Sequence, residues 1–428
     1  MIYRIGDIAG LIKRCLFTSI IFSFLVTNSI AQQTAVKEAD IVQKFYLQSH
    51  QQLFWFSSEN NIKKATEWLL LIENAEHLGI SSDKLQSNLI RVALLSNNSL
   101  DSIYKEQRDR QISGLVLKFI KVLQEGNIKF DYDGVNITRD SVYINQLRNS
   151  KTLESVPEMV ERLDCKDHEY LVLKNFLNDS IRTMDSLKYK KIAVAMNYRR
   201  YFTVNHPPER IIVNIPETEV RYYQNDFLKV KMRAVVGKKL TPTPTIASFV
   251  TDVVTFPRWN VPHSIAVKEL LPKVQKNDNY LEQNNFEIVN ARGKVVDDSD
   301  LKWGKYNESN FPYYFRQATG SRNSLGIVKF NFQNPFSIFL HSTSWKGAFA
   351  MNYRFLSHGC IRLEKPLELA KTLLPDKIDI KELKRGKKNT ESETIKLPQR
   401  IPVFIIYNPV MVVGNKVAFL PDVYGLVK

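Results

Sequence analysis

The sequence contains little cysteine, with three residues in 428. One of them, Cys15, lies in a stretch that we expect to be removed, which leaves Cys165 and Cys360. Two cysteines cannot form the dense disulfide framework of a small secreted domain. They indicate either one disulfide or a reactive thiol with a bystander.

Long apolar runs are also missing near the N-terminus. The run from Cys15 to Val26 is well short of the ~20 residues that span a bilayer. It follows the basic residues Arg4, Lys13 and Arg14, and Ser29 and Ala31 form a small-residue cleavage site after it. We therefore predict a signal peptide over residues 1–31, cleaved near Ala31, and export to the periplasm or cell envelope.

Acidic residues are outnumbered, with 44 Asp and Glu against 60 Lys and Arg and a net charge of +16. Such an excess usually indicates a nucleic-acid partner. Export argues against that partner, and the basic residues are scattered except for a run at 381–388. We expect no nucleic acid, and instead an anionic envelope polymer or a membrane surface.

The first half of the chain has apolar residues at helical spacing and predicts an all-α domain over residues 32–205. Gly79 is expected to end one helix, and Ser82 to begin the next. The clearest helical stretches are Ala65–Leu78, Leu115–Leu123 and Tyr170–Leu187.

The pattern changes after residue 206 and predicts a β-rich domain over residues 206–428, so the fold class is α+β with a β-sandwich-like second domain. We expect the stretch Thr241–Thr245 to cross the surface because its prolines exclude a helix and a central strand. Residues 257–331 read as an inserted capping subdomain, and Lys381–Thr394 as a mobile loop. The predicted strands are Arg210–Ile215, Val220–Tyr223, Phe227–Val236, Ile327–Phe332, Phe336–His341, Ile401–Tyr407 and Val417–Leu420, with a turn at 224–226 and a helix over Ser264–Val274.

The sharpest local motif is Ser357-His358-Gly359-Cys360-Ile361-Arg362. A nucleophilic thiol needs an imidazole to take its proton, and His341 or His358 is a candidate for that base. Ser342 could orient the ring of His341. Backbone N–H groups around Gly359 and Cys360 could form an oxyanion hole, and Arg362 could bind a carboxylate.

Two other interpretations of these residues stay open on the residues alone. A free cysteine is usually buried and inert, so Cys360 could be structural. Cys360, His358 and His341 could also supply three zinc ligands, although no fourth ligand is evident nearby.

The spacing of His341, fifteen residues and then Ser357-His358-Gly359-Cys360 resembles the signature of the L,D-transpeptidase (YkuD-type) catalytic domain. Further stretches resemble the large Gram-negative branch of this family, which carries an N-terminal helical scaffold domain: Val235-Val236-Gly237, Thr241–Thr245, Trp259-Asn260-Val261-Pro262 and Leu271-Pro272-Lys273. The family often has asparagine where this chain has Arg362, and no peptidoglycan-binding module is recognisable in the first half.

The resemblance implies that Cys360 attacks the diaminopimelyl carbonyl of a tetrapeptide stem and that a second stem resolves the acyl-enzyme, which forms a 3-3 crosslink. His341 would be the base, Ser342 its orienting residue, and His358, Gly359 and Cys360 the oxyanion-forming segment. Trp259 and Arg354 would line the substrate cleft with Arg362.

No cofactor or metal is implied by the resemblance, and the implied partners are stem peptides, carbapenem-type inhibitors and other cell-wall synthesis proteins. The same site could instead act as an L,D-carboxypeptidase or attach a protein to peptidoglycan. A non-enzymatic envelope-binding protein is a further alternative, which the presence of both Cys360 and His341 disfavours.

Overall fold

A computed structural model describes residues 40–50, 52–80, 87–92, 102–135, 139–149, 154–180, 185–299, 301–320, 322–386 and 391–427. The predicted signal peptide and the predicted N-cap Ser82 lie outside these residues. The chain folds as two compact units. One comprises Met1–Asn127, Thr138–Met184 and Met196–Val204, and the other Ile128–Ile137, Asp185–Ala195 and Asn205–Lys428.

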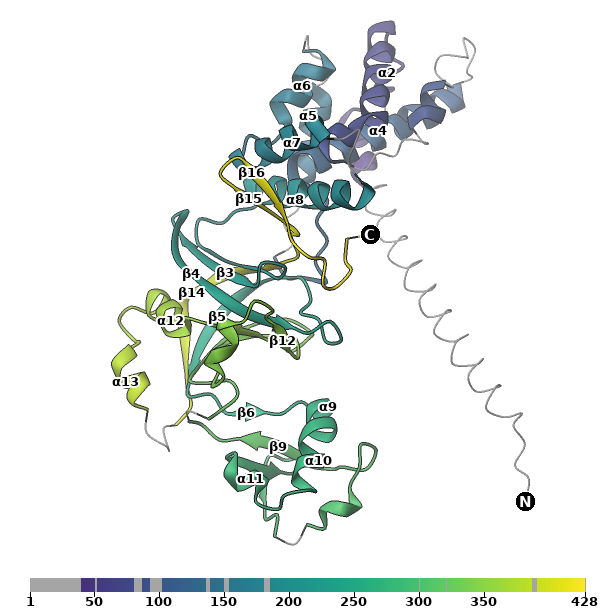
Figure 1. The fold of residues 1–428 in the computed structure, drawn as a ribbon. Helices are drawn as coiled ribbons and strands as arrows, with labels where there is room; N and C mark the ends of the chain where they lie inside the picture. The colour runs from purple at the N-terminus through teal and green to yellow at the C-terminus, as the bar shows by residue number, and fades with distance from the viewer. Residues whose placement is uncertain are drawn as a thin grey trace, which may run out of the picture. The chain divides into compact units, whose positions relative to one another are not determined.

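The first unit is helical, as the sequence predicts (Figure 1). Trp68, Leu69 and Ile72 of its first long helix are buried, and Gly79 ends the following turn with φ 64° as expected of a helix C-terminus. The predicted helix Tyr170–Leu187 is instead two helices, which end and begin at Ser180 and Ser186. The described helices of this part of the chain are α2 (Glu59–Glu73), η1 (Ala75–Leu78), α4 (Ser102–Glu125), α5 (Asp140–Asn149), α6 (Val156–Leu163), α7 (His168–Ser180) and α8 (Ser186–Val204), with further helical residues at 40–48 and 87–92. The part of α8 up to Ala195 belongs to the second unit.

Among the described helices, none combines the length and apolar character needed to cross a membrane.

The second unit is built on a ten-stranded sheet in the order β1-β5-β10-β11-β13-β4-β3-β2-β14, with β12 beside β4. Its strands are β1 (Tyr132–Asp133), β2 (Arg210–Asn214), β3 (Glu219–Gln224), β4 (Phe227–Gly237), β5 (Ile246–Thr255), β10 (Val328–Phe332), β11 (Leu340–His341), β12 (Phe355–Ser357), β13 (Ile361–Leu363) and β14 (Glu393–Ile406). Strand β1 comes from the part of the chain that the sequence assigned to the helical domain, and it pairs with β5.

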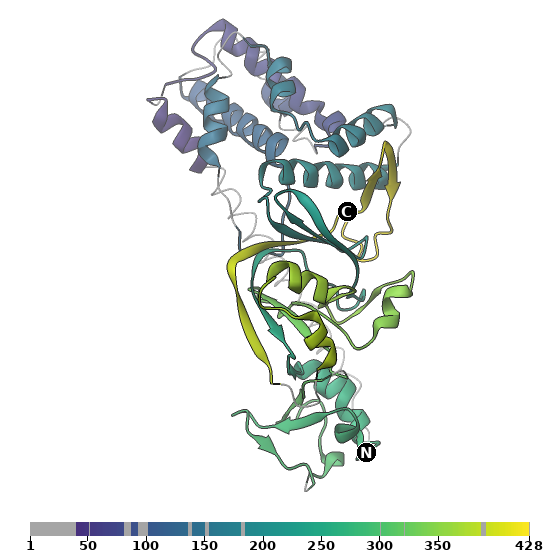
Figure 2. The same ribbon diagram turned by 90° about the vertical axis from the view of Figure 1, so that its left-hand side faces the viewer.

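The sheet closes on itself because β14 pairs with β2 on one edge and with β5 on the other. Figure 2 shows this long strand, in olive-yellow, running along the sheet. The helix α13 (Ile380–Arg385) and the start of strand β14 occupy half of the range where the sequence predicted a mobile loop, at 381–394. Residues 387–390 lie outside the described part of the chain.

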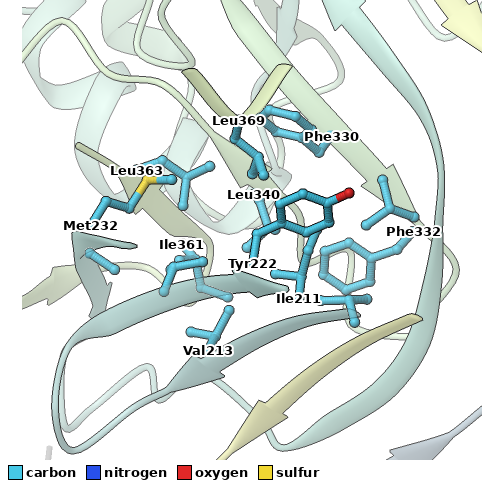
Figure 3. Packing of buried hydrophobic residues seen from close by; sticks show 14 of the residues in the cluster. Ile211, Val213, Tyr222, Met232, Phe330, Phe332, Leu340, Ile361, Leu363 and Leu369 are labelled. Carbon is cyan, nitrogen blue, oxygen red and sulfur yellow. The ribbon is translucent and has the colours of Figure 1, made fainter. Parts of the chain in front are cut away.

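Alternating residues of the sheet point inward and form one core, which follows from the two-residue period of a strand. Figure 3 shows Tyr222, Phe330, Leu340 and Ile361 directed toward one another from different strands. The helix α12 (Pro366–Leu373) adds Leu369 to this core. Side chains at the intervening strand positions therefore leave the sheet on its outer face.

Residues between β5 and β10 form the inserted subdomain, drawn in green in Figure 1. A four-stranded sheet in the order β6-β9-β7-β8 packs with a helical segment at the predicted position, around an aromatic core that includes Phe286, Phe311 and Phe315. The insertion ends before Val328 and not at 331, because β10 belongs to the large sheet. Its elements are β6 (Trp259–Asn260), α9 (His263–Ile265), η2 (Ala266–Leu270), α10 (Leu271–Val274), α11 (Tyr280–Gln283), β7 (Phe286–Val289), β8 (Val295–Val296), η3 (Trp303–Lys305) and β9 (Tyr314–Gln317).

The predicted meander is confirmed: β2, β3 and β4 pair in sequence, and Asn225 and Asp226 adopt positive φ in the turn between the last two. The predicted strand Phe336–His341 is shorter, because only Leu340 and His341 pair with neighbours. The η4 turn (Lys346–Ala350) follows it, and a hairpin of β15 (Val410–Val413) and β16 (Lys416–Phe419) ends the unit.

Candidate active site

The strand pairing brings His341 and Cys360 to neighbouring positions. Strands β11 and β13 are parallel, with Leu340 opposite Ile361 and His341 opposite Arg362. Leu340 and Ile361 are buried in the core, so His341 and Arg362 leave the sheet on the outer face. Cys360 directly precedes Ile361, so the register sets it opposite Phe339, two residues before His341. Its side chain packs against the core, and its Sγ donates to the Ser337 carbonyl oxygen at 3.6 Å.

A backbone carbonyl fixes the ring of His341. Its Nδ1 donates to the Ser342 carbonyl oxygen at 2.5 Å, and the backbone of Leu325 also contacts the ring. In the neutral tautomer with the proton on Nδ1, Nε2 is the nitrogen that can accept a proton. The Ser342 hydroxyl does not reach the ring, because its Oγ accepts the backbone N–H groups of Ile327 and Val328 and donates to the Leu325 carbonyl. Ser342 thus holds the imidazole through its main chain.

Burial, and next to it the positive charge of Arg362, lower the pKa of His341 to about 3. Burial raises the pKa of the Cys360 thiol, while a backbone contact with Phe339 and the charges of Lys329 and Arg362 oppose that rise. At neutral pH the resting site therefore holds a neutral imidazole and a neutral thiol. The arrangement can take a proton from sulfur as the sulfur attacks.

Gly359 turns the motif between its histidine and its cysteine, with φ 119°. A side chain there would be strained, and its Cβ would lie 3.0 Å from Ile338 Cδ1. The Gly359 N–H donates to Ser357 Oγ at 3.1 Å, so it is already engaged. Within the part of the chain that the structure describes, the Cys360 N–H has no acceptor. It remains a candidate oxyanion donor.

His358 points away from the thiol and toward the inserted subdomain. Its Nε2 lies 2.5 Å from Glu269 Oε1 in η2 and 3.3 Å from Lys238 Nζ. The sequence predicts His358 and Cys360 on one face if the segment is extended, but Gly359 between them has φ 119° and interrupts the strands β12 and β13. His358 is engaged by the insertion, and His341, on the strand paired with β13, remains the candidate base.

The predicted cleft residues lie in different surroundings. The Arg362 guanidinium lies 6.0 Å from the Trp345 ring centroid and has no carboxylate partner among the described residues. Arg354 donates to the carbonyls of Met351 and Glu217, which ties two loops together. Trp259 packs against Phe286 in the core of the insertion. Of these three residues, Arg362 is the one that lies opposite His341 in the sheet.

The stretch Thr241–Thr245 does not cross the surface as predicted, because Thr243 is buried. Thr243 Oγ1 donates to the Gly359 carbonyl at 2.7 Å and accepts the Gly237 N–H at 2.9 Å. The contact of Thr243 with the motif depends on tertiary packing. The sequence shows only that this segment lacks the pattern of a strand or a helix.

Gly326 was also missed. Its φ is 63°, and a Cβ there would lie 2.2 Å from Ser342 Oγ and 2.8 Å from the Thr343 nitrogen. A glycine directly before the predicted strand at 327 was the only available signal.

The zinc alternative requires several ligands to gather at one point. Among the residues that the structure describes, no three His, Cys, Asp or Glu side chains are placed to hold a metal ion. Cys165 and Cys360 are both free, so the disulfide alternative is not realised. Cys165 is buried in the helical unit beside Thr203 Oγ1, at 3.2 Å.

The chain was compared with known proteins. Residues 208–388 match the L,D-transpeptidase catalytic domain, and residues 40–177 match a family described as the Scaffold domain. A Haemophilus influenzae protein named "Putative L,D-transpeptidase" is 30% identical over 342 residues, which are 79% of this chain and 67% of that protein.

Two solved structures are also similar. An Enterococcus faecium L,D-transpeptidase C442S mutant has a TM-score of 0.21 and an L,D-transpeptidase from Mycobacterium smegmatis one of 0.22, each at 12% identity. The matches cover 47% and 46% of this chain, and 50% and 58% of those structures. The chain thus spans about half the length of these structures, and at such scores they add no argument. The two domain matches and the Haemophilus relative show that this chain belongs to the L,D-transpeptidase family.

Proposed function

We propose that this protein is a peptidoglycan L,D-transpeptidase that forms 3-3 crosslinks between stem peptides, with Cys360 as nucleophile and His341 as its base. The observation that carries the proposal is the parallel pairing of β11 with β13, which brings the strand that carries His341 beside the segment that carries Cys360. Membership of the family supports the same chemistry.

In the acylation step, Cys360 Sγ attacks the carbonyl carbon of the diaminopimelyl residue of a tetrapeptide stem while its proton passes to His341 Nε2. The C–N bond to the terminal D-alanine then breaks, and the leaving amine takes the proton from the imidazole. A thioester remains. The side-chain amine of a second stem attacks this thioester, the C–S bond breaks, and the proton returns to sulfur.

The anionic groups of the substrate fit the charges of the site. Stem peptides carry carboxylates, and the Arg362 guanidinium, which interacts electrostatically with the thiol, has no acidic partner among the described residues. Arginine binds carboxylates through two parallel hydrogen bonds. The net charge of +16 would favour an anionic wall polymer in the same way.

Acylating β-lactams of the carbapenem type are expected to form an adduct on Cys360, because the same thiol can attack a strained amide. Peptide mapping after incubation would locate the added mass. Cys165 is buried and is expected to stay unmodified. An adduct on Cys165 with Cys360 free would contradict the assignment of the nucleophile.

The direct test is incubation of the protein, and of its Cys360→Ala variant, with purified tetrapeptide-stem muropeptides, followed by mass analysis of proteins and products. Dimers joined through two diaminopimelyl residues, absent with the variant, are the expected result. The acyl-enzyme mass should appear on the wild-type protein alone.

Other products would indicate the alternative reactions of the same site. Free D-alanine with tripeptide stems, and no dimers, would identify an L,D-carboxypeptidase. Dimer formation unchanged by Cys360→Ala would overturn the mechanism, and unchanged stems with both proteins would leave the envelope-binding alternative.

A further inference from the structure

Three side chains form a row across neighbouring strands on the outer face of the sheet. Lys329 of β10 is opposite His341 of β11, and His341 is opposite Arg362 of β13. Phe330 and Leu340, next along the same strands, are buried in the core, which confirms the direction of the row. Two fixed cations therefore stand on either side of the imidazole.

Both cations lack an acidic partner of their own. Within the described residues, neither Lys329 nor Arg362 forms an ion pair, although each is half-buried. The Lys329 ammonium lies 3.9 Å from the Phe339 ring centroid. The nearest acid that acts on it is Asp252, whose carboxylate accepts hydrogen bonds from Asn331 and Thr251.

A half-buried cation without a partner has to be balanced by something else that is negative. Cys360 is the group in reach, because Lys329 and Arg362 both act on the thiol electrostatically, and the backbone of Phe339, whose ring lies under the Lys329 ammonium, contacts the same sulfur. His341, between the two cations in the row, is neutral at working pH.

We propose that Lys329, together with Arg362, supplies the positive charge that stabilises the Cys360 thiolate, so that the sulfur does not depend on a histidine imidazolium for that charge. Lys329 is then a positioning residue that acts through its charge. It lies outside the motif Ser357-His358-Gly359-Cys360-Ile361-Arg362. The inference rests on the proposed function only in taking Cys360 as the nucleophile.

This arrangement affects the proton that moves from Cys360 to His341. An imidazolium between two cations is repelled from both sides, so the proton that His341 takes from sulfur is released readily to the leaving amine. The cations remain beside the negative sulfur when the proton has moved away. A cysteine–histidine ion pair, in contrast, would lose its stabilising charge when the histidine gives up its proton.

The test is the pH dependence of Cys360 alkylation by iodoacetamide, measured by peptide mapping, which needs no peptidoglycan. Lys329→Met keeps an unbranched side chain of similar length and removes the charge that lies over the Phe339 ring. It should slow alkylation at pH 7 about tenfold by moving the midpoint about one pH unit upward. His341→Gln should change the rate less than about twofold. Lys416→Met, at an exposed site in β16, is the matched control and should change nothing.

The opposite ranking would overturn the proposal. If His341→Gln shifted the midpoint upward and Lys329→Met did not, the thiolate would be balanced by the imidazolium. A thermal melt of each variant separates loss of charge from loss of fold, and Lys329→Arg should restore the wild-type midpoint if charge is the cause.

Turnover of muropeptides gives a second readout. Loss of a charge that acts on sulfur should lower kcat and leave KM nearly unchanged. A rise in KM with kcat preserved would instead make Lys329 a binding group for a substrate carboxylate. If the wild-type protein did not turn over muropeptides but Lys329→Met still slowed its alkylation, the proposed function would fail and the thiolate inference would stand.

Discussion

The side chain of Ser342 makes three hydrogen bonds to backbone groups, and its own carbonyl holds the ring of His341. Gly326 lies directly against that hydroxyl in a left-handed conformation. The position of His341 thus depends on Gly326, which is remote from the motif and has no side chain.

Gly326→Ala is expected to destabilise the protein by about 2–4 kcal/mol, from backbone strain and from displacement of Ser342. Because a small shift of the base is costly for catalysis, the rate of Cys360 acylation should fall about 10- to 100-fold. Chemical denaturation and carbapenem acylation measure the two effects.

The matched control is Gly414→Ala. Gly414 has φ 59°, close to that of Gly326, but a Cβ there has no atom within 4 Å. It should cost only about 1 kcal/mol and leave acylation unchanged. If both substitutions slowed acylation equally, backbone strain, and not the contact with Ser342, would be the cause of the slower acylation.

At the scale of single residues, the sequence identified candidate site residues where the chemistry of the side chains and their spacing in the motif agree. Cys360 and His341 could be selected because a thiol needs a base. Lys329 could not be selected, because its place opposite His341 depends on the register between two strands. The contact of His358 with Glu269 could not be predicted for a related reason, because it joins residues that are far apart in the sequence.

Among the elements, the segment between β4 and β5 connects the motif to the sheet. Thr243 bridges the Gly359 carbonyl and the Gly237 N–H, and its own N–H donates to the Tyr424 hydroxyl at 3.2 Å. The prolines that exclude regular structure here leave the backbone groups available for these irregular contacts.

Thr243→Val keeps the shape of the side chain and removes both of its hydrogen bonds. Two buried backbone groups then lose their partners, and the free energy of unfolding should fall by about 2–4 kcal/mol. Acylation of Cys360 should slow as the motif loosens. Thr251→Val, at an exposed position of β5, should stay within about 0.5 kcal/mol of wild type.

If Thr243→Val were no more destabilising than Thr251→Val, the bridge would have no role in holding the motif. The sequence identified the segment as irregular and the meander as antiparallel. It could not show that the irregular segment is buried, because burial here comes from β12 and the C-terminal residues packing over it.

For the whole molecule, the neutral His341 links stability to pH. Its pKa in the folded protein is about 3, below its ordinary value near 6.5, so the unfolded chain binds a proton first as the pH falls. The stability that depends on the neutral form is complete above about pH 6.5 and is lost progressively below it. The loss should be about 2 kcal/mol between pH 7 and pH 5.

Urea unfolding at pH 7, 6 and 5 measures this loss. His341→Gln should remove most of it, whereas Thr251→Val, at an exposed position that carries no titratable group, should leave the pH slope unchanged. The same slope in both variants would mean that another group titrates in this range.

The order of a helical region followed by a β-rich region was predictable from composition and periodicity along the chain. The closure of the sheet was not, because it pairs β14 with β2 and β5 across large sequence distances that carry no local pattern. The predicted signal peptide and the export that it implies lie outside the described residues and stay predictions.

Strand β14 completes the sheet by joining β2 to β5. The motif with Cys360 precedes this strand in the chain, and the strands that frame it belong to the same closed sheet. The sheet therefore cannot close until the residues of β14 are present, although His341 and Cys360 both lie before them in the sequence. We expect a nascent chain that ends before β14 to carry both residues of the candidate pair without the closed sheet around them.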